Sequence, residues 1–245
     1  MRRRIMSRTR RLPTPEGPTE IARLGDLAYS LWLPKMQPWG GMVVIHGAGS
    51  CKENHHDMAR TARDAGLAVI AFDLRGHGAT GGRFDGRALA DVASIAALLP
   101  RPVALRGSSL GGYLAIAAAE SAGAAGVVAI CPASGRGLAA GLRSGTLDFP
   151  VDLGAAEALL SEHDLGLIVE RSAVPLMLIH AEGDERVPFR HSVELHERSA
   201  AATKRLIVVP GGHHRSVQHD VELQGESVRF LRRVLAEPGG QPGDG

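Results

Sequence analysis

The sequence has little cysteine, no long apolar run and no excess of one charge sign over its 245 residues. Cys51 and Cys131 are far apart and form no CxxC pattern, so neither a disulfide framework nor a structural zinc site is predicted, and both thiols are expected to be reduced. No run approaches the roughly 20 apolar residues that span a membrane, and the basic start leads into a polar segment instead of a signal-peptide core. We therefore expect a cytoplasmic protein with no membrane partner.

The charge distribution argues against nucleic acid as a partner. The 28 Lys and Arg residues exceed the 26 Asp and Glu residues by two. Six arginines precede the first acid, Glu16, so the rest of the chain carries +2 less 6, or −4, and the excess belongs to one terminal segment. Composition predicts a flexible basic arm at residues 1–20 and a disordered tail at 237–245.

Between these ends, short apolar runs alternate with helical patterns. Most runs are continuous, as expected for strands that are buried on both faces of a sheet. In residues 88–99, apolar residues repeat at three and four positions, which predicts an amphipathic helix. Strand and helix in alternation predict an α/β fold for residues 21–236, with a mostly parallel sheet and helices on both faces. The expected strands lie at 27–33, 42–46, 67–72, 102–106, 126–130, 175–180 and 205–209.

One strand end carries a serine motif, at the edge where such sheets bind their ligands. The letters GSSLG at 107–111 lie between an expected strand and an expected helix, which is the context of a nucleophile elbow. The tight turn favours glycine two residues to either side of Ser109 and projects that side chain from the sheet, whereas Ser108 is expected to point elsewhere. An ordinary glycine-rich turn explains the same letters, so the motif needs further support.

A serine nucleophile requires a base, and the base requires an acid that orients it. Asp184 follows the strand expected at 175–180, and both His213 and His214 follow the strand expected at 205–209. The order serine, acid, histidine, each after a strand, is the order of the α/β-hydrolase fold. These residues are therefore the candidates for acyl-transfer chemistry.

Acyl transfer also requires hydrogen-bond donors for the negative oxygen of the intermediate. The turn at 47–50, GAGS, follows the strand expected at 42–46. We assign the oxyanion hole to the backbone amides of Ala48 in this turn and of Leu110 at the start of the helix after the serine, where the helix dipole helps. His46 is expected to pack and form hydrogen bonds in the turn.

Together these segments resemble the α/β-hydrolase superfamily, of the dienelactone hydrolase, lysophospholipase and small serine esterase kind. The resemblance covers about residues 27–235. In this family the histidine commonly follows a glycine by three residues, which from Gly211 selects His214 and leaves His213 as the second candidate. Dienelactone hydrolases proper use cysteine, so serine at position 109 implies ester chemistry instead. Five motifs carry the resemblance, in the order HGAG, DLRGHG, GSSLGG, HAEGDERVP and GGHHRS.

The resemblance implies a carboxylesterase-like hydrolase of a small to medium acyl substrate, with an acyl-enzyme and no metal or organic cofactor. It also implies a short lid at about residues 133–174, with room for one or two helices and an aliphatic lining. Arg136 and Arg143 in this lid are candidates to meet an anionic substrate. We expect a monomer or a homodimer whose partner is a small molecule.

Other functions share some of these features. A non-catalytic ligand- or partner-binding protein of the same fold, haloperoxidase- or perhydrolase-like acyl transfer, and peptidase or thioesterase activity are all compatible with the residue types. The letters GHGATG at 76–81 match a dinucleotide-binding pattern, but the following strand offers no acid for a ribose. The cluster His55, His56 and Asp57 suggests a metal, yet adjacent histidines on a helix diverge, so an exposed helix start is the preferred interpretation.

Overall fold

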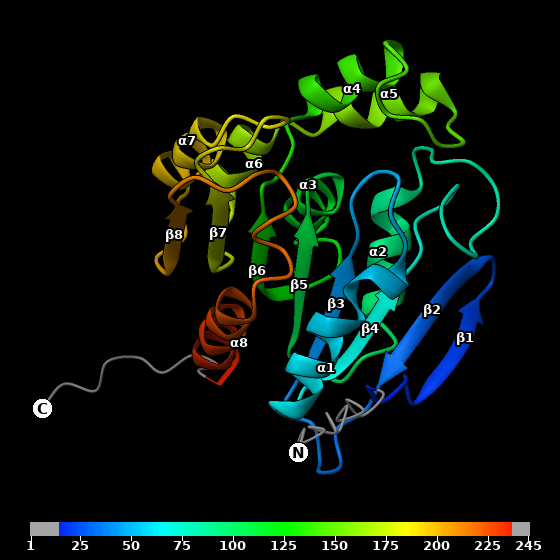
Figure 1. The fold of residues 1–245 in the computed structure, drawn as a ribbon, viewed down its shortest axis with the longest axis vertical. Helices are drawn as coiled ribbons and strands as arrows, with labels where there is room; N and C mark the ends of the chain where they lie inside the picture. Colours follow the sequence, from blue (N-terminus) through cyan, green and yellow to red (C-terminus); the bar gives the residue numbers. More distant parts are fainter. Residues whose placement is uncertain (1–14, 237–245) are drawn as a thin grey trace, which may run out of the picture.

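The computed structural model describes residues 15–236, so the predicted tail and most of the predicted basic arm lie outside the described residues. The described part contains one sheet in the order β1-β2-β4-β3-β5-β6-β7-β8 (Figure 1). Strands β3 to β8 run parallel, and β2 pairs antiparallel with both β1 and β4. This confirms the predicted mostly parallel α/β sheet. The strands are β1 (Glu20–Leu24), β2 (Leu27–Trp32), β3 (Gly41–Ile45), β4 (Ala68–Phe72), β5 (Val103–Ser108), β6 (Ala124–Ile130), β7 (Leu176–Ala181) and β8 (Lys204–Val209).

Helices cover both faces of this sheet, because successive residues of a buried strand point to opposite faces. On β3, Met42 and Val44 join the apolar cluster that holds α1 and α8, whereas Val43 and Ile45 join the cluster that holds α2, α3 and α7. Within residues 15–236, no helix is both long enough and apolar enough to cross a membrane. The helices are η1 (Lys52–His55), α1 (His56–Asp64), α2 (Ala88–Ala96), α3 (Leu110–Ala117), α4 (Gly135–Arg143), α5 (Leu153–Glu162), α6 (Leu165–Arg171), α7 (Arg190–Arg198) and α8 (Val221–Ala236).

The segment between β6 and β7, where a lid was expected, contains three helices instead of one or two. Helices α4 and α5 pack on each other and lie beyond the carboxyl ends of the central strands (Figure 1). Helix α6 packs against α3 and α7, beside the sheet. Each of the three begins with a capping side chain, which accepts a hydrogen bond from an amide of the first turn, so each forms a separate short helix.

Candidate active site

Ser109 occupies the turn between β5 and α3 in a conformation that side-chain-bearing residues rarely adopt. Its φ is 56° and its ψ is −115°, in a region that costs a non-glycine residue free energy. The neighbouring glycines make this turn possible, since a Cβ at Gly107 would collide with the carbonyl of Gly111, and a Cβ at Gly111 would collide with the carbonyl of Ile45. The spacing of the motif is thus a packing requirement of the turn.

Asp184 and His214 meet across the loops that follow β7 and β8. The Nδ1 atom of His214 lies 2.7 Å from Oδ2 of Asp184, while the amides of Arg186 and Val187 both donate to Oδ1 at 2.9 Å. Burial alone raises the pKa of Asp184, but the hydrogen bonds from His180, His214 and the two amides outweigh it, so the pKa lies well below its usual range. Asp184 is therefore a carboxylate that holds a proton on Nδ1 of His214.

His180, at the end of β7, is a fourth partner of this carboxylate that the sequence analysis missed. Its Nε2 lies 2.9 Å from the carbonyl oxygen of Val187 and 3.2 Å from Oδ2 of Asp184. Both are acceptors, so Nε2 carries the proton, and Nδ1 accepts from the hydroxyl of Ser192 at 2.7 Å. The HAEGD segment places this histidine four residues before the acid, a spacing that the sequence shows without indicating a contact.

The structure distinguishes the two adjacent histidines by their neighbours. His213 is exposed and its Nδ1 accepts from the amide of Arg215. His214 has a side chain that is 9% exposed, and its own amide donates to Oε2 of Glu185 at 3.0 Å. The histidine that faces Asp184 is thus His214.

Ser109 and His214 line one cavity of about 520 Å³. It lies beneath helices α4 and α5, which we call the cap. Ala48 lines the same cavity, and Leu110 contributes the first amide of α3, one of those that an α-helix leaves without an internal partner. A Cβ at Gly47 would approach the Cβ of Ser109 to 3.3 Å, which shows how closely this turn passes the serine. The lining also includes aliphatic residues and polar residues. The aliphatic residues are Ala133, Leu138, Leu147, Val187 and Pro188, and the polar ones include Glu185, Arg186, Arg215, Ser108 and Gln218.

Two neutral histidines hold the turn that carries Ala48. The amide of Gly49 donates to Nε2 of His77 at 3.1 Å, and the amide of Leu74 donates to Nε2 of His46 at 3.0 Å. Burial lowers the pKa of His46 to about 4 and also lowers the pKa of His77, so both rings are neutral near pH 7 and accept these bonds. The structure agrees with the packing and hydrogen-bonding role expected for His46.

A buried ion pair fixes the other end of the same turn. Lys52 is 3% exposed, and its Nζ lies 2.8 Å from Oδ2 of the fully buried Asp73. The amides of Lys52 and Ala79 also donate to this carboxylate, at 2.7 and 2.8 Å. The letters GHG at 76–78 thus belong to a turn that packs on the Asp73 carboxylate, since a Cβ at Gly78 would collide with it.

Three side chains of metal-binding type come together within the described residues. They are Cys131, Asp184 and His214, whose ligand atoms lie within 4.8 Å of one another. Burial raises the pKa of the Cys131 thiol, and a protonated thiol is a poor metal ligand. The His55, His56 and Asp57 cluster spreads apart, because the ring of His56 meets Ser30 while Asp57 pairs with His219 on another loop. The expectation of an exposed helix start is wrong for His55, which is 2% exposed.

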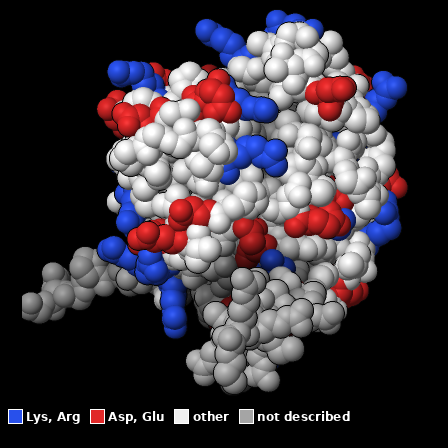
Figure 2. Space-filling model, viewed as in Figure 1, with Lys and Arg blue, Asp and Glu red and all other residues white. Residues whose placement is uncertain are grey.

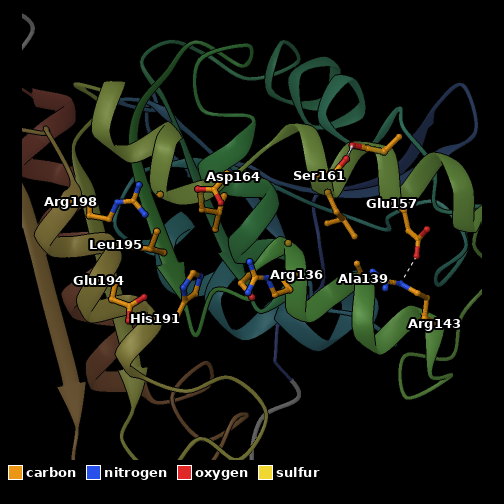
Figure 3. A pocket seen from close by; sticks show the side chains of 16 residues that line it. Arg136, Ala139, Arg143, Glu157, Ser161, Asp164, His191, Glu194, Leu195 and Arg198 are labelled. Carbon is orange, nitrogen blue, oxygen red and sulfur yellow. Dashed lines mark hydrogen bonds and ion pairs between the residues drawn. The ribbon is translucent and has the colours of Figure 1, made fainter.

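The cap borders a second cavity, of about 760 Å³, which shares only Ser134 of its lining residues with the cavity of Ser109. In Figure 3, Arg136, Asp164 and His191 point into it from α4, the start of α6 and α7. Arg143 forms an ion pair with Glu157 at 2.6 Å across α4 and α5. Arg136 and Arg143 therefore face this cavity and not the one that contains Ser109.

Acidic and basic side chains are interspersed on the face shown in Figure 2.

The sequence matches the model of the alpha/beta hydrolase family over residues 42–169, which is more than half of the chain. The chain therefore belongs to the alpha/beta hydrolase family, as its motifs predicted. A curated relative, a monoacylglycerol lipase of Mycolicibacterium smegmatis, is 39% identical over 57 residues, which are 23% of this chain and only 20% of the lipase.

Solved structures share the fold over most of their length. The esterase Est1E of Butyrivibrio proteoclasticus, solved with ferulic acid, is 21% identical and has a TM-score of 0.68, with 86% of this chain and 96% of that chain covered. A monoacylglycerol lipase of Paleococcus ferrophilus is 20% identical with a TM-score of 0.68, over 86% and 98% of the two chains. Mouse alpha/beta hydrolase domain-containing protein 10 is 20% identical with a TM-score of 0.69, over 89% and 98%.

Proposed function

We propose that this protein is a serine hydrolase that cleaves a carboxylic ester of a small to medium substrate through an acyl-enzyme. One observation carries the proposal: His214, hydrogen-bonded to Asp184 at 2.7 Å, lines the same cavity as Ser109 on its strained turn. The names of the similar proteins, an esterase and monoacylglycerol lipases, support ester cleavage over the other acyl transfers.

The reaction begins with attack of Ser109 Oγ on the carbonyl carbon of the ester. His214 Nε2 accepts the serine proton, because Asp184 keeps the other ring proton on Nδ1. The amides of Ala48 and Leu110 donate to the negative oxygen of the tetrahedral intermediate, at about 3 kcal/mol or more for each such donor. As the intermediate collapses, His214 gives its proton to the departing alcohol and the acyl group remains on Ser109.

Water completes the cycle. His214 Nε2 takes a proton from the water while its oxygen attacks the acyl carbon, and collapse of the second intermediate releases the acid and returns the proton to Ser109. These steps need no metal or organic cofactor. The cavity of about 520 Å³ lies within the usual range for small-molecule sites, and its aliphatic lining suits a short to medium acyl chain. Helix α4, which lines the cavity, and α5, which packs on α4, act as the lid in this proposal.

Fluorophosphonate labelling of the purified protein tests the proposal, because the probe reacts with an activated serine whatever the natural substrate is. We expect one label per chain, located on the peptide that contains Ser109, and no label in Ser109→Ala. Ser161→Ala, which removes an exposed cap serine, is the matched control and retains the label. A folded wild-type protein that stays unlabelled would contradict the proposal and favour a non-catalytic binding protein.

A further inference from the structure

The loop that carries His214 has to cross much of the sheet. β8 is an edge strand, and β7 and β6 lie between it and β5, whose end carries Ser109. Neighbouring strands are about 4.8 Å apart, so the loop spans about 14 Å before it reaches the serine. In Figure 1 the orange segment runs from β8 past the ends of β7 and β6 and then turns into α8. A loop of this reach needs an anchor on the far side.

Gln218, four residues after His214, is attached to β5 at two points. The hydroxyl of Ser108 donates to Oε1 of Gln218 at 2.9 Å, and Nη2 of Arg106 donates to the Gln218 carbonyl oxygen at 3.2 Å. The relative exposures of Ser108, Gln218 and Arg106 are 5%, 9% and 1%. Both the side chain and the main chain of this loop residue are therefore held below the surface by the strand that leads to Ser109.

The hydrogen bond to the Gln218 carbonyl gives the buried Arg106 a partner. Burial of a cation without a close carboxylate is costly, and desolvation lowers the pKa of Arg106 to about 10, with the charge of Asp57 acting in the opposite direction. The group remains protonated near pH 7. Its hydrogen bond reaches the histidine loop, 112 residues away in the chain. A charged donor strengthens a hydrogen bond, so this contact holds the main chain of Gln218 against β5 even at 3.2 Å.

The far end of the loop is fixed to the helices behind the sheet. Nε2 of Gln218 lies 2.8 Å from Nε2 of His219, and Nδ1 of His219 lies 2.9 Å from Oδ2 of Asp57 on α1. Gln224 of α8 donates to the same carboxylate oxygen at 2.7 Å. The contacts are consistent with a neutral His219 that accepts from Gln218 and donates to Asp57. Gln218 thus belongs to a connected set of buried and half-buried polar groups.

We infer that Gln218, held by Ser108 and Arg106, is the positioning residue that keeps His214 within reach of Ser109. The inference rests on the proposed function. Asp184 holds the imidazole from the β7 side, and Gln218 holds the loop from the β5 side, so His214 is fixed between two anchors. Because Ser108 precedes the nucleophile directly, the same hydrogen bond ties the base loop to the elbow.

The rate at which a fluorophosphonate labels Ser109 tests this role, measured beside the kcat and KM of a p-nitrophenyl ester. Ser108→Ala removes the donor, Gln218→Met removes the amide at similar volume, and the double variant removes both. We expect each single change to lower the labelling rate and kcat about tenfold or more with KM within about twofold, since small misplacements of reacting groups are costly. We expect the double variant to be no slower than the slower single one.

A matched control separates positioning from general loss of packing. Ser227→Ala removes another fully buried serine hydroxyl, which donates to the Leu223 carbonyl within α8, and it should leave the labelling rate at the wild-type value. Folded Gln218→Met protein that labels at the wild-type rate, or single effects that multiply in the double variant, would overturn the inference. An unlabelled wild-type protein would instead overturn the proposed function, and the positioning role with it.

Discussion

Two regions near the proposed substrate cavity are held by different kinds of interaction. At the end of the turn that carries Ala48, Lys52 and Asp73 are 3% and 0% exposed and form a buried ion pair. In the cap helices α4 and α5, Arg143 and Glu157, which line the second cavity, form an ion pair while 62% and 36% exposed. Loss of one partner from a buried pair leaves an uncompensated charge, whereas an exposed pair contributes little. We therefore expect the Lys52–Asp73 pair to contribute strongly to the stability of the fold and the Arg143–Glu157 pair to contribute little.

The largest effect is expected at Ser109, and it concerns the reaction rate and not the stability of the fold. Ser109→Ala removes the proposed nucleophile, so ester hydrolysis should fall by at least about a thousandfold. The hydroxyl has no structural partner that the fold needs, and the free energy of unfolding should change by less than about 1 kcal/mol. Steady-state kinetics and urea titration measure the two quantities. Retained hydrolysis in this variant would place the chemistry elsewhere.

The next largest effect is on the free energy of unfolding, at the buried ion pair of Lys52 and Asp73. Lys52→Met leaves the buried carboxylate of Asp73 without its cation, so we expect a loss of about 3 to 5 kcal/mol in the free energy of unfolding. Urea denaturation followed by circular dichroism measures it. A loss below about 1 kcal/mol would mean that the pair behaves like an exposed one, and the contrast between the two pairs would disappear.

The pH dependence of stability sharpens the comparison through His55, whose buried ring nitrogens have no hydrogen-bond partner within residues 15–236. Burial lowers its pKa to about 3 from 6.5. The unfolded chain therefore binds the proton more readily, so this contribution is complete above pH 6.5 and decreases as the pH falls toward 3. Between pH 7.5 and pH 5 it amounts to about 2 kcal/mol.

His55→Leu is the variant that tests this linkage, because it fills the site without a titrating group. Its free energy of unfolding should decrease less than that of the wild type between pH 7.5 and pH 5. Glu157→Gln in the cap serves as the control and should retain the wild-type slope. Equal slopes in wild type and His55→Leu would show that His55 is not buried as a neutral ring.

The smallest effect is expected in the cap. Arg143→Met makes the same kind of change as Lys52→Met but at an exposed pair, so the free energy of unfolding should change by less than about 1 kcal/mol. Denaturation under the same conditions gives a direct comparison of the two variants. A loss comparable to that of Lys52→Met would show that the Arg143–Glu157 pair contributes as much to stability as the Lys52–Asp73 pair.

The sheet was largely predictable because its central strands are buried on both faces and appear as continuous apolar runs. All seven predicted strands are present, each within about two residues of its expected bounds. The missed strand is β1, at the edge. Its Glu20 and Arg23 interrupt the apolar pattern, and its backbone is held by antiparallel pairing with β2, which a pattern of burial does not reveal.

The placement of the candidate site residues was predictable where a motif fixes both residue type and backbone. Ser109 sits at a turn whose glycines the packing requires, and the loops after β7 and β8 bring Asp184 and His214 together. The contact between Ser108 and Gln218 was not predictable, because it joins residues 110 apart through common polar side chains. Lysine is rarely buried, so the sequence offered no signal that Lys52 lies inside and pairs with Asp73.

Capture of the acyl-enzyme tests the central claim most directly. The protein is mixed with excess p-nitrophenyl ester, quenched in acid within the first turnovers and digested, and the acylated peptide is identified by mass spectrometry. We expect a burst of p-nitrophenol and one acyl group on Ser109, and neither in Ser109→Ala. An acyl group on another residue, or hydrolysis that continues unchanged in Ser109→Ala, would contradict it.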